Sequence, residues 1–176
     1  MNSEPCPGCK GLFTHSEGMR FRYGTSSAGC WKAFTHLQGY EHDLLQFPPE
    51  HRLTVDSYMV QHPQNIPLQK ELDIDERLIA ASIQSVAVHL LALYCVLEKN
   101  VPFERITHTV MPRSIERTKH PLLEPPESLG ALTIADFSPK FSSHEYHTFA
   151  WNWARSAWQA WSPYHALVRH WYDLTL

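Results

Sequence analysis

A long stretch of apolar residues at helical spacing restricts the fold of this chain more than any other feature. After Asp73, apolar side chains recur on one helical face and its flanks, at Leu78, Ile79, Ile83, Val86, Leu90, Leu93, Val96 and Leu97. The centre of this segment is apolar on nearly every side, so other elements have to cover the helix that it forms. The chain has 176 residues, of which 43% are hydrophobic, which is enough for one core. We therefore expect a single all-α domain, a helical bundle over residues 26–176.

Two shorter helices are expected before the central one. Ser26 or Ser27 is suited to cap a first helix, which has to end before Pro48. A second helix is expected from about Glu50 to His62, because the next residue is a proline. The prolines between the two helices favour a tight return of the chain. We therefore expect an antiparallel helical hairpin.

The second half of the chain predicts an irregular segment and one or two aromatic helices. Residues 111–131 contain four prolines, too many for regular structure, and they either cover a pocket or wrap the surface. Ser142 and Glu145 have the spacing of a capping box in front of an aromatic helix over residues 146–161. Pro163 then either begins a final helix or kinks a single long one.

Residues 1–25 have a different character from the rest of the chain. They hold four of the seven glycines and show little apolar periodicity, so they predict a loop-rich knuckle. Cys6 and Cys9 are separated by Pro-Gly, a spacing that lets two thiolates bind one tetrahedral ion, and Cys30 is the natural third ligand. A redox pair is the alternative, although no helix follows Cys9 and no βαβ pattern surrounds it. We predict a zinc knuckle packed on the bundle.

The fourth ligand has to be a histidine, chosen among His15, His36, His42, His51 and His62. In the expected hairpin, the second helix returns along the first at 1.5 Å per residue, so its end rather than its start approaches Cys30. This favours His62 over His51, and the alternative for His62 is a surface position before a proline. A closed site of three cysteines and one histidine is typical of structural zinc.

Five polar residues of the predicted helices are candidates for a second site, a pocket inside the bundle: His51, Asp56, His89, His165 and Arg169. His89 is surrounded on its helix by small residues, which leave room for a buried imidazole that needs a polar partner. It is either a neutral core histidine or a metal ligand or base. His165 ends the aromatic stripe, and we expect it to face the same polar pocket as His89.

Two charged pairs have simpler interpretations beside the functional one. Arg52 and Asp56 are four residues apart, a spacing typical of a modest surface bridge. His165 and Arg169 are also one turn apart, which suits an anionic or oxygenated ligand or a pair of cations at a helix end.

Charge and composition exclude several classes of function. A net charge of −3 leaves no basic excess for a run of phosphates, so we expect no nucleic-acid partner. The longest apolar run, residues 86–97, is interrupted by His89 and is shorter than a membrane span, and no export signal is visible. Cys95 lies in the apolar helix, away from the other three cysteines, so metal-bound thiolates in a reducing cytoplasm fit better than disulfides.

Several motifs together resemble a known family. They are the N-terminal Cys-Pro-x-Cys, Gly29-Cys30-Trp31, the run from His51 to Pro63, the segment from Gln84 to Leu90, Leu123-Glu124-Pro125-Pro126, and the terminal pattern from Trp158 to Arg169. In this combination the chain resembles the uncharacterised bacterial domain-of-unknown-function family fifty-nine forty-six over almost its full length. The resemblance implies a bacterial protein and supplies no activity. It also implies that the three cysteines, His62 and the five pocket residues are motif positions of the family.

Two functions are compatible with these patterns. The first is an intracellular zinc-binding protein, in which zinc is structural and the tryptophan-lined face with its proline-rich loop receives an unknown small molecule or protein partner. The second is a metal-dependent enzyme in which His51, His89 and His165 hold a metal and Asp56 or Arg169 orients water or a thiol. That alternative is an architectural analogy to the helical DinB-type thiol transferases.

Overall fold

The computed structural model describes residues 2–18, 24–64, 66–71 and 73–176. Its central helix, α4 (Glu76–Leu97), begins after Asp75, whose side chain accepts a hydrogen bond from the backbone N–H of Arg77. Side chains from Val86 to Val96 are almost all buried, and α2, α6, α7 and α8 pack against this helix. The prediction of a helical fold around this segment is confirmed in part: the chain is mostly helical, but a two-stranded sheet means that it is not all-α.

The same helix is, within the described residues, long and apolar enough to span a membrane by composition alone. However, 61% of its most apolar window is buried inside the protein, as in the core helix of a soluble protein. Burial by neighbouring helices therefore accounts for its apolar character.

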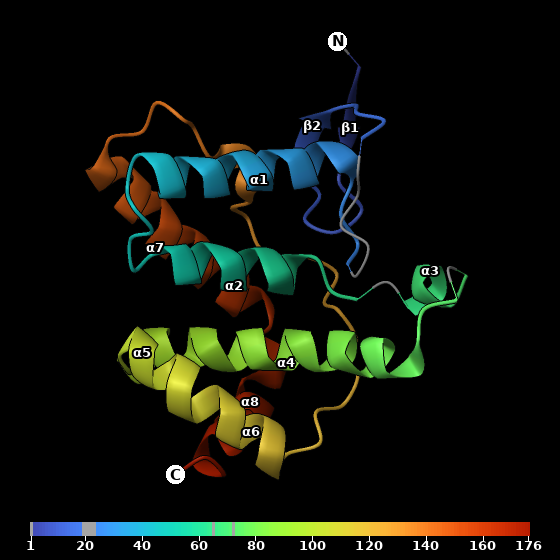
Figure 1. Cartoon of the computed structure of the whole chain (residues 1–176), viewed down its shortest axis with the longest axis vertical. Coiled ribbons are helices and arrows are strands. Elements are labelled where there is room, and N and C mark those ends of the chain that lie inside the picture. Colours follow the sequence, from blue (N-terminus) through green and yellow to red (C-terminus); the bar gives the residue numbers. More distant parts are fainter. Residues whose placement is uncertain (1, 19–23, 65, 72) are drawn as a thin grey trace.

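The predicted hairpin is formed by α1 (Ala28–Asp43) and α2 (His51–Gln61), which run antiparallel beside each other (Figure 1). Ser27 is the cap of α1, because its hydroxyl accepts a hydrogen bond from the backbone N–H of Cys30. The first helix ends four residues before the expected limit of residue 47, and the second ends at Gln61, one residue before its predicted end.

After the helical hairpin, the structure contains short helices that the sequence did not predict. A short helix, α3 (Ile66–Glu71), precedes α4, and after α4 the chain forms α5 (Phe103–Arg105), the π-helical turn η1 (Ile106–Val110) and α6 (Met111–Arg117) without a break. The prediction that residues 111–131 are irregular is wrong for α6. Pro112 directly follows the π-helical turn η1, which already interrupts the regular i→i−4 pattern, so the helical run can accommodate its missing N–H. The rest of the segment is irregular, as expected.

The C-terminal helices follow the sequence signals closely. After the turn η2 (Ile134–Asp136), α7 (Ser143–Ala160) begins with the predicted capping box: Ser142 and Glu145 exchange hydrogen bonds between side chain and backbone. The chain then turns at Trp161 through η3 (Ser162–Tyr164), and α8 (His165–Asp173) follows as a separate helix. Of the two alternatives at Pro163, the structure selects a new helix.

The N-terminal segment is a small β-hairpin rather than loops alone. Strands β1 (Ser3–Pro5) and β2 (Leu12–Thr14) are antiparallel, with Ser3 opposite Thr14, while residues 1 and 19–23 of the predicted knuckle lie outside the described residues. The hairpin lies against the start of α1 (Figure 1). A Cβ atom at Gly29 would lie only 2.5 Å from the carbonyl oxygen of Thr14, so this close contact needs a glycine.

A fully buried carboxylate, Glu41, joins three helices. Its Oε1 accepts hydrogen bonds from the hydroxyls of Thr54 at 2.7 Å and Tyr146 at 2.6 Å, and its Oε2 lies 2.6 Å from Nδ1 of His51. Burial and the nearby Glu41 raise the pKa of Tyr146, so its hydroxyl stays protonated and donates. Because these partners come from α2 and α7, Glu41 fixes α1 on both helices.

We expect Glu41→Leu to lower the free energy of unfolding by about 3 to 5 kcal/mol, because it leaves buried donors without an acceptor. The exposed Glu127 provides the control, and Glu127→Leu should change stability by less than about 0.5 kcal/mol. Urea unfolding followed by circular dichroism measures both. Equal stabilities of the two variants would show that the network does not stabilise the fold.

Candidate metal centre

Cys6 and Cys9 lie on the turn that joins β1 to β2. The backbone N–H of Cys6 donates to the carbonyl of Gly11 at 2.8 Å, and the N–H of Lys10 donates to the carbonyl of Cys6 at 3.1 Å. This narrow turn brings both thiols to one side of the hairpin. It also packs directly on α2, since a Cβ atom at Gly8 would lie 2.6 Å from Cδ2 of His62.

The other two side chains come from the ends of the helical hairpin. Cys30 lies in the first turn of α1, at the positive end of the helix dipole. His62 follows the last turn of α2, and its Nδ1 lies 2.7 Å from the carbonyl oxygen of Tyr58. A carbonyl only accepts, so Nδ1 carries the proton and Nε2 presents a lone pair. That Nε2 lies 3.2 Å from Sγ of Cys30.

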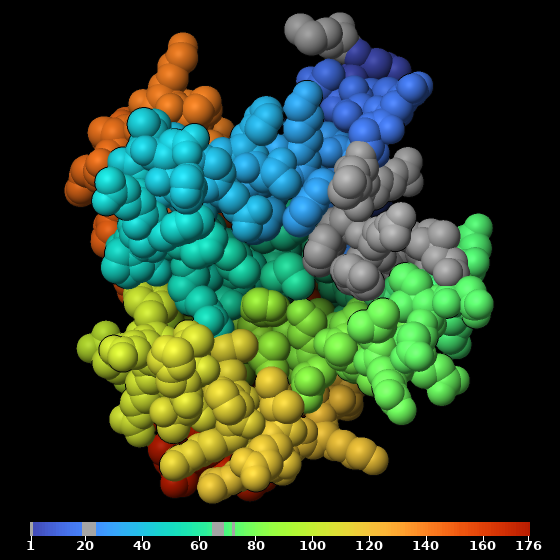
Figure 2. Space-filling view, viewed as in Figure 1, coloured from blue at the N-terminus to red at the C-terminus, as the bar shows by residue number. Residues whose placement is uncertain are grey.

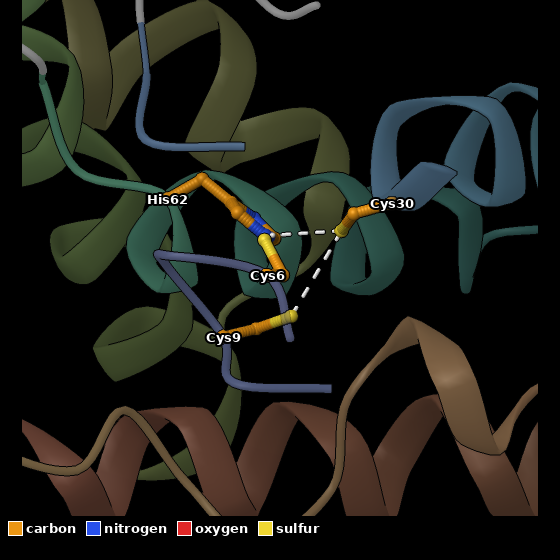
Figure 3. A group of neighbouring side chains, drawn as sticks. All are labelled: Cys6, Cys9, Cys30 and His62. Carbon is orange, nitrogen blue, oxygen red and sulfur yellow. Dashed lines mark hydrogen bonds between the residues drawn. The ribbon is translucent and has the colours of Figure 1, made fainter. Parts of the chain in front are cut away.

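The four potential ligand atoms form a compact group. The three sulfur atoms and the imidazole nitrogen all lie within 4.8 Å of one another, and all four residues are buried. Zinc–sulfur bonds of about 2.3 Å in a tetrahedron separate two sulfurs by about 3.8 Å, and Sγ of Cys9 lies 3.8 Å from Sγ of Cys30. Figure 3 shows the four side chains turned toward a common point between the β-hairpin and helices α1 and α2.

Electrostatics favour a cation at this point. Hydrogen bonds from Cys30 and Cys9 lower the pKa of Cys6, whereas hydrogen bonds to Cys6 and Cys9 raise the pKa of Cys30. The thiols thus compete for one negative charge, because three buried thiolates without a counter-ion would repel each other strongly. A divalent cation removes that competition and lets all three act as thiolate ligands.

Residues around the group hold its ligands in place. The hydroxyl of Tyr58 lies 2.7 Å from Oγ of Ser26 and 3.9 Å from Sγ of Cys30, and its ring stacks on Phe34 with 3.9 Å between centroids. Tyr58 is not among the candidate residues predicted from the sequence. Its position one helical turn before His62, on the same face, is the signal that identifies it.

The other histidines considered as the fourth ligand lie elsewhere. His15 pairs with Glu4, His42 with Asp43 and His51 with Glu41, and His36 is exposed. His51 is at the opposite end of α2 from His62, as the hairpin predicted. The structure therefore places His62, rather than these four, beside the cysteines.

Of the predicted pocket residues, the structure brings Asp56 and His89 together. Asp56 is fully buried; its Oδ1 lies 2.6 Å from Nδ1 of His89, and its Oδ2 accepts from Nε of Arg52 at 3.0 Å. The expectation of a surface bridge between Arg52 and Asp56 is therefore wrong. Asp56 points toward α4, where His89 is its second partner. The spacing of Arg52 and Asp56 within one helix cannot reveal this contact.

The remaining pocket residues have separate surroundings. His51 pairs with Glu41, and Arg169 is exposed. His165 stacks on Trp158 with 3.7 Å between ring centroids, and its Nε2 lies 3.0 Å from the carbonyl oxygen of Trp158. Among the described residues, no hydrogen bond or ring contact joins His165 to His89, and the cysteine–histidine group is the one set of three or more potential ligands within mutual reach.

These features define a mostly helical protein with a buried group of three cysteines and one histidine that can hold a metal ion. The sequence pattern of the family of unknown function DUF5946 matches residues 4–162, so the chain belongs to this family. The match includes all four potential ligands. No curated protein and no solved structure matches the chain.

We predict that His62→Ala weakens zinc binding more than His51→Ala does. Loss of a ligand should exceed the roughly 10- to 100-fold effect of losing a residue that only supports a ligand. His51 is the matched control, because it begins α2, whereas His62 follows the last residue of this helix, and because its imidazole pairs with Glu41. Competition with a chromogenic chelator measures both affinities, and a larger loss at His51 would contradict the assignment.

Proposed function

We propose that this protein binds one zinc ion through Cys6, Cys9, Cys30 and His62, and that the ion holds the N-terminal hairpin on the helical bundle. The observation that carries the proposal is the compact group of four buried ligand atoms, with Nδ1 of His62 already committed to a backbone carbonyl. Sulfur-rich, tetrahedral sites of this kind select zinc among the common divalent ions.

The donor set supports a structural role for the ion. Four protein ligands complete a tetrahedral shell, so no position is left for water or substrate. The ligands also come from segments distant in the sequence: the β-hairpin, the start of α1 and the end of α2. An ion bound by all of them fixes the position of a segment that has few apolar contacts of its own.

A catalytic site with His51, His89 and His165 as ligands receives less support. Their imidazoles pair with different groups, Glu41, Asp56 and the backbone of Trp158. The proposal therefore assigns one metal ion to the chain. It also places the protein in the reducing cytoplasm of a bacterium, where free thiols persist as metal ligands.

The metal content per chain tests the stoichiometry and the ligands. We expect one zinc per chain in the purified protein and less than about 0.1 in a Cys6→Ser, Cys9→Ser variant, because two ligands of a closed site are lost. Cys95→Ser is the matched control, since Cys95 is a buried free thiol in α4, and it should retain the ion. Elemental analysis gives all three values. Zinc retained by the double variant would point to a second site and contradict the proposal.

Removal of the ion should release the N-terminal segment and leave most of the helices folded. The bundle has its own apolar cluster around α4, which contains none of the four ligands. After treatment with a strong chelator, we expect amide hydrogens of residues 2–18 to exchange faster by at least about tenfold, while those of α4 and α7 stay protected. Hydrogen exchange followed by mass spectrometry measures this, and readdition of zinc should reverse it. Unchanged exchange at the N-terminus would refute the structural role.

A further inference from the structure

A groove distant in the chain from the cysteines lies between the first half of α4 and the segment formed by α6 and the residues that follow it. Its volume is about 800 Å³, within the usual range of small-molecule sites. In Figure 2 the two walls lie next to each other, the green start of α4 above the gold residues of α6 and its continuation. None of its lining residues belongs to the metal centre or to the Asp56–His89 pair.

The walls of the groove are largely apolar. Ala80 and Ile83 of α4 face Ile115 of α6 and Leu122 of the irregular segment. Ile115 is 47% exposed and Leu122 is 56% exposed, so two exposed large apolar side chains line one groove. Exposed apolar side chains that gather in one concave place indicate a binding surface.

Two cations also line the groove, one from each wall. Arg77 comes from α4 and Lys119 from the segment after α6. Within the described ranges, neither side chain has a salt bridge or a hydrogen bond, and no acidic residue lines the groove. The groove therefore combines apolar walls with two cations and no acidic residue in its lining, which favours an anionic ligand.

The irregular wall holds two polar atoms without partners among the described residues. They are Oγ1 of Thr118 and Nδ1 of His120, and both are buried. Burial lowers the pKa of His120, so its ring is neutral, and its Nε2 lies 2.9 Å from Oγ of Ser114. Unpaired buried polar atoms are unfavourable.

We propose that this groove binds a small amphipathic anion, an apolar chain or ring that bears one carboxylate. The apolar part would lie on Ala80, Ile83, Ile115 and Leu122. The carboxylate would lie between Arg77 and Lys119. The proposal does not depend on the zinc assignment, because the two sites share no residue.

Octanoate is a suitable probe, with 1-octanol and octylammonium as neutral and cationic matches. At low salt we expect octanoate to bind at one site, about three- to tenfold more tightly than octanol, and octylammonium to bind more weakly than either. High salt should reduce the preference for octanoate, because exposed ion pairs are screened. Calorimetric titration of the full chain with each probe gives the affinities. Octanol that binds as tightly as octanoate would overturn the proposal.

Substitutions locate the probe. Lys119→Ala should weaken octanoate about two- to fivefold and leave octanol unchanged, whereas Ala80→Trp, which fills the groove, should abolish binding of both. Lys140→Ala, an exposed lysine outside the groove, is the control and should bind like the wild type. All three positions are exposed, so folding should persist, which circular dichroism verifies. Undiminished octanoate binding by Ala80→Trp would show that the probe binds elsewhere.

Discussion

The position of the N-terminal segment depends on one constraint: three thiols and one imidazole meet at a buried point. The apolar cluster around this point includes Cys6, Cys9 and Cys30 together with Phe34, Tyr58 and Trp153, so the sulfurs are packed among aromatic rings. In such surroundings more than one thiolate is stable only beside a cation. All four ligand residues are buried. They come from the β-hairpin, α1 and the end of α2, so the proposed ion would link these three segments.

The second helix of that hairpin, α2, is the polar centre of the fold. It buries Thr54, Asp56 and Gln61, and the buried His62 directly follows it; these polar side chains would destabilise the interior if any of them lacked a partner. Gln61 shows how this is avoided, since its amide donates to the carbonyls of Leu129 and Leu132 and accepts from the indole N–H of Trp153. The polar side chains of α2 thus connect the cysteine site, the irregular segment and α7, while α4 supplies the apolar packing.

The sequence predicted helix starts and the buried helix best where a local signal, a capping side chain or an apolar face, has a single interpretation. The hydroxyl of Ser27 as a helix cap, the capping box at Ser142 and the apolar face of α4 all appear in the structure as expected. The prolines gave a wrong prediction at α6, because Pro112 follows a π-helical turn that accommodates its missing N–H, and the sequence pattern does not reveal such a turn. Glu41 was missed, although it continues the buried stripe of Cys30, Phe34 and Leu37, because a carboxylate on an apolar face acquires meaning only from its partners.

By itself the sequence determined that the chain is mostly helical and which family it resembles. It also indicated Cys6, Cys9, Cys30 and His62 as potential ligands of one ion, because the spacing within a turn and the length of a helix can be read from the sequence. Only the tertiary structure decided that Nε2 of His62 faces Cys30, that Asp56 pairs with His89, and that His165 stacks on Trp158. It also decided that Arg77 and Lys119 line one groove. These contacts join residues from different elements, and their formation depends on how helices are rotated and offset against each other, which no periodicity within a single helix fixes.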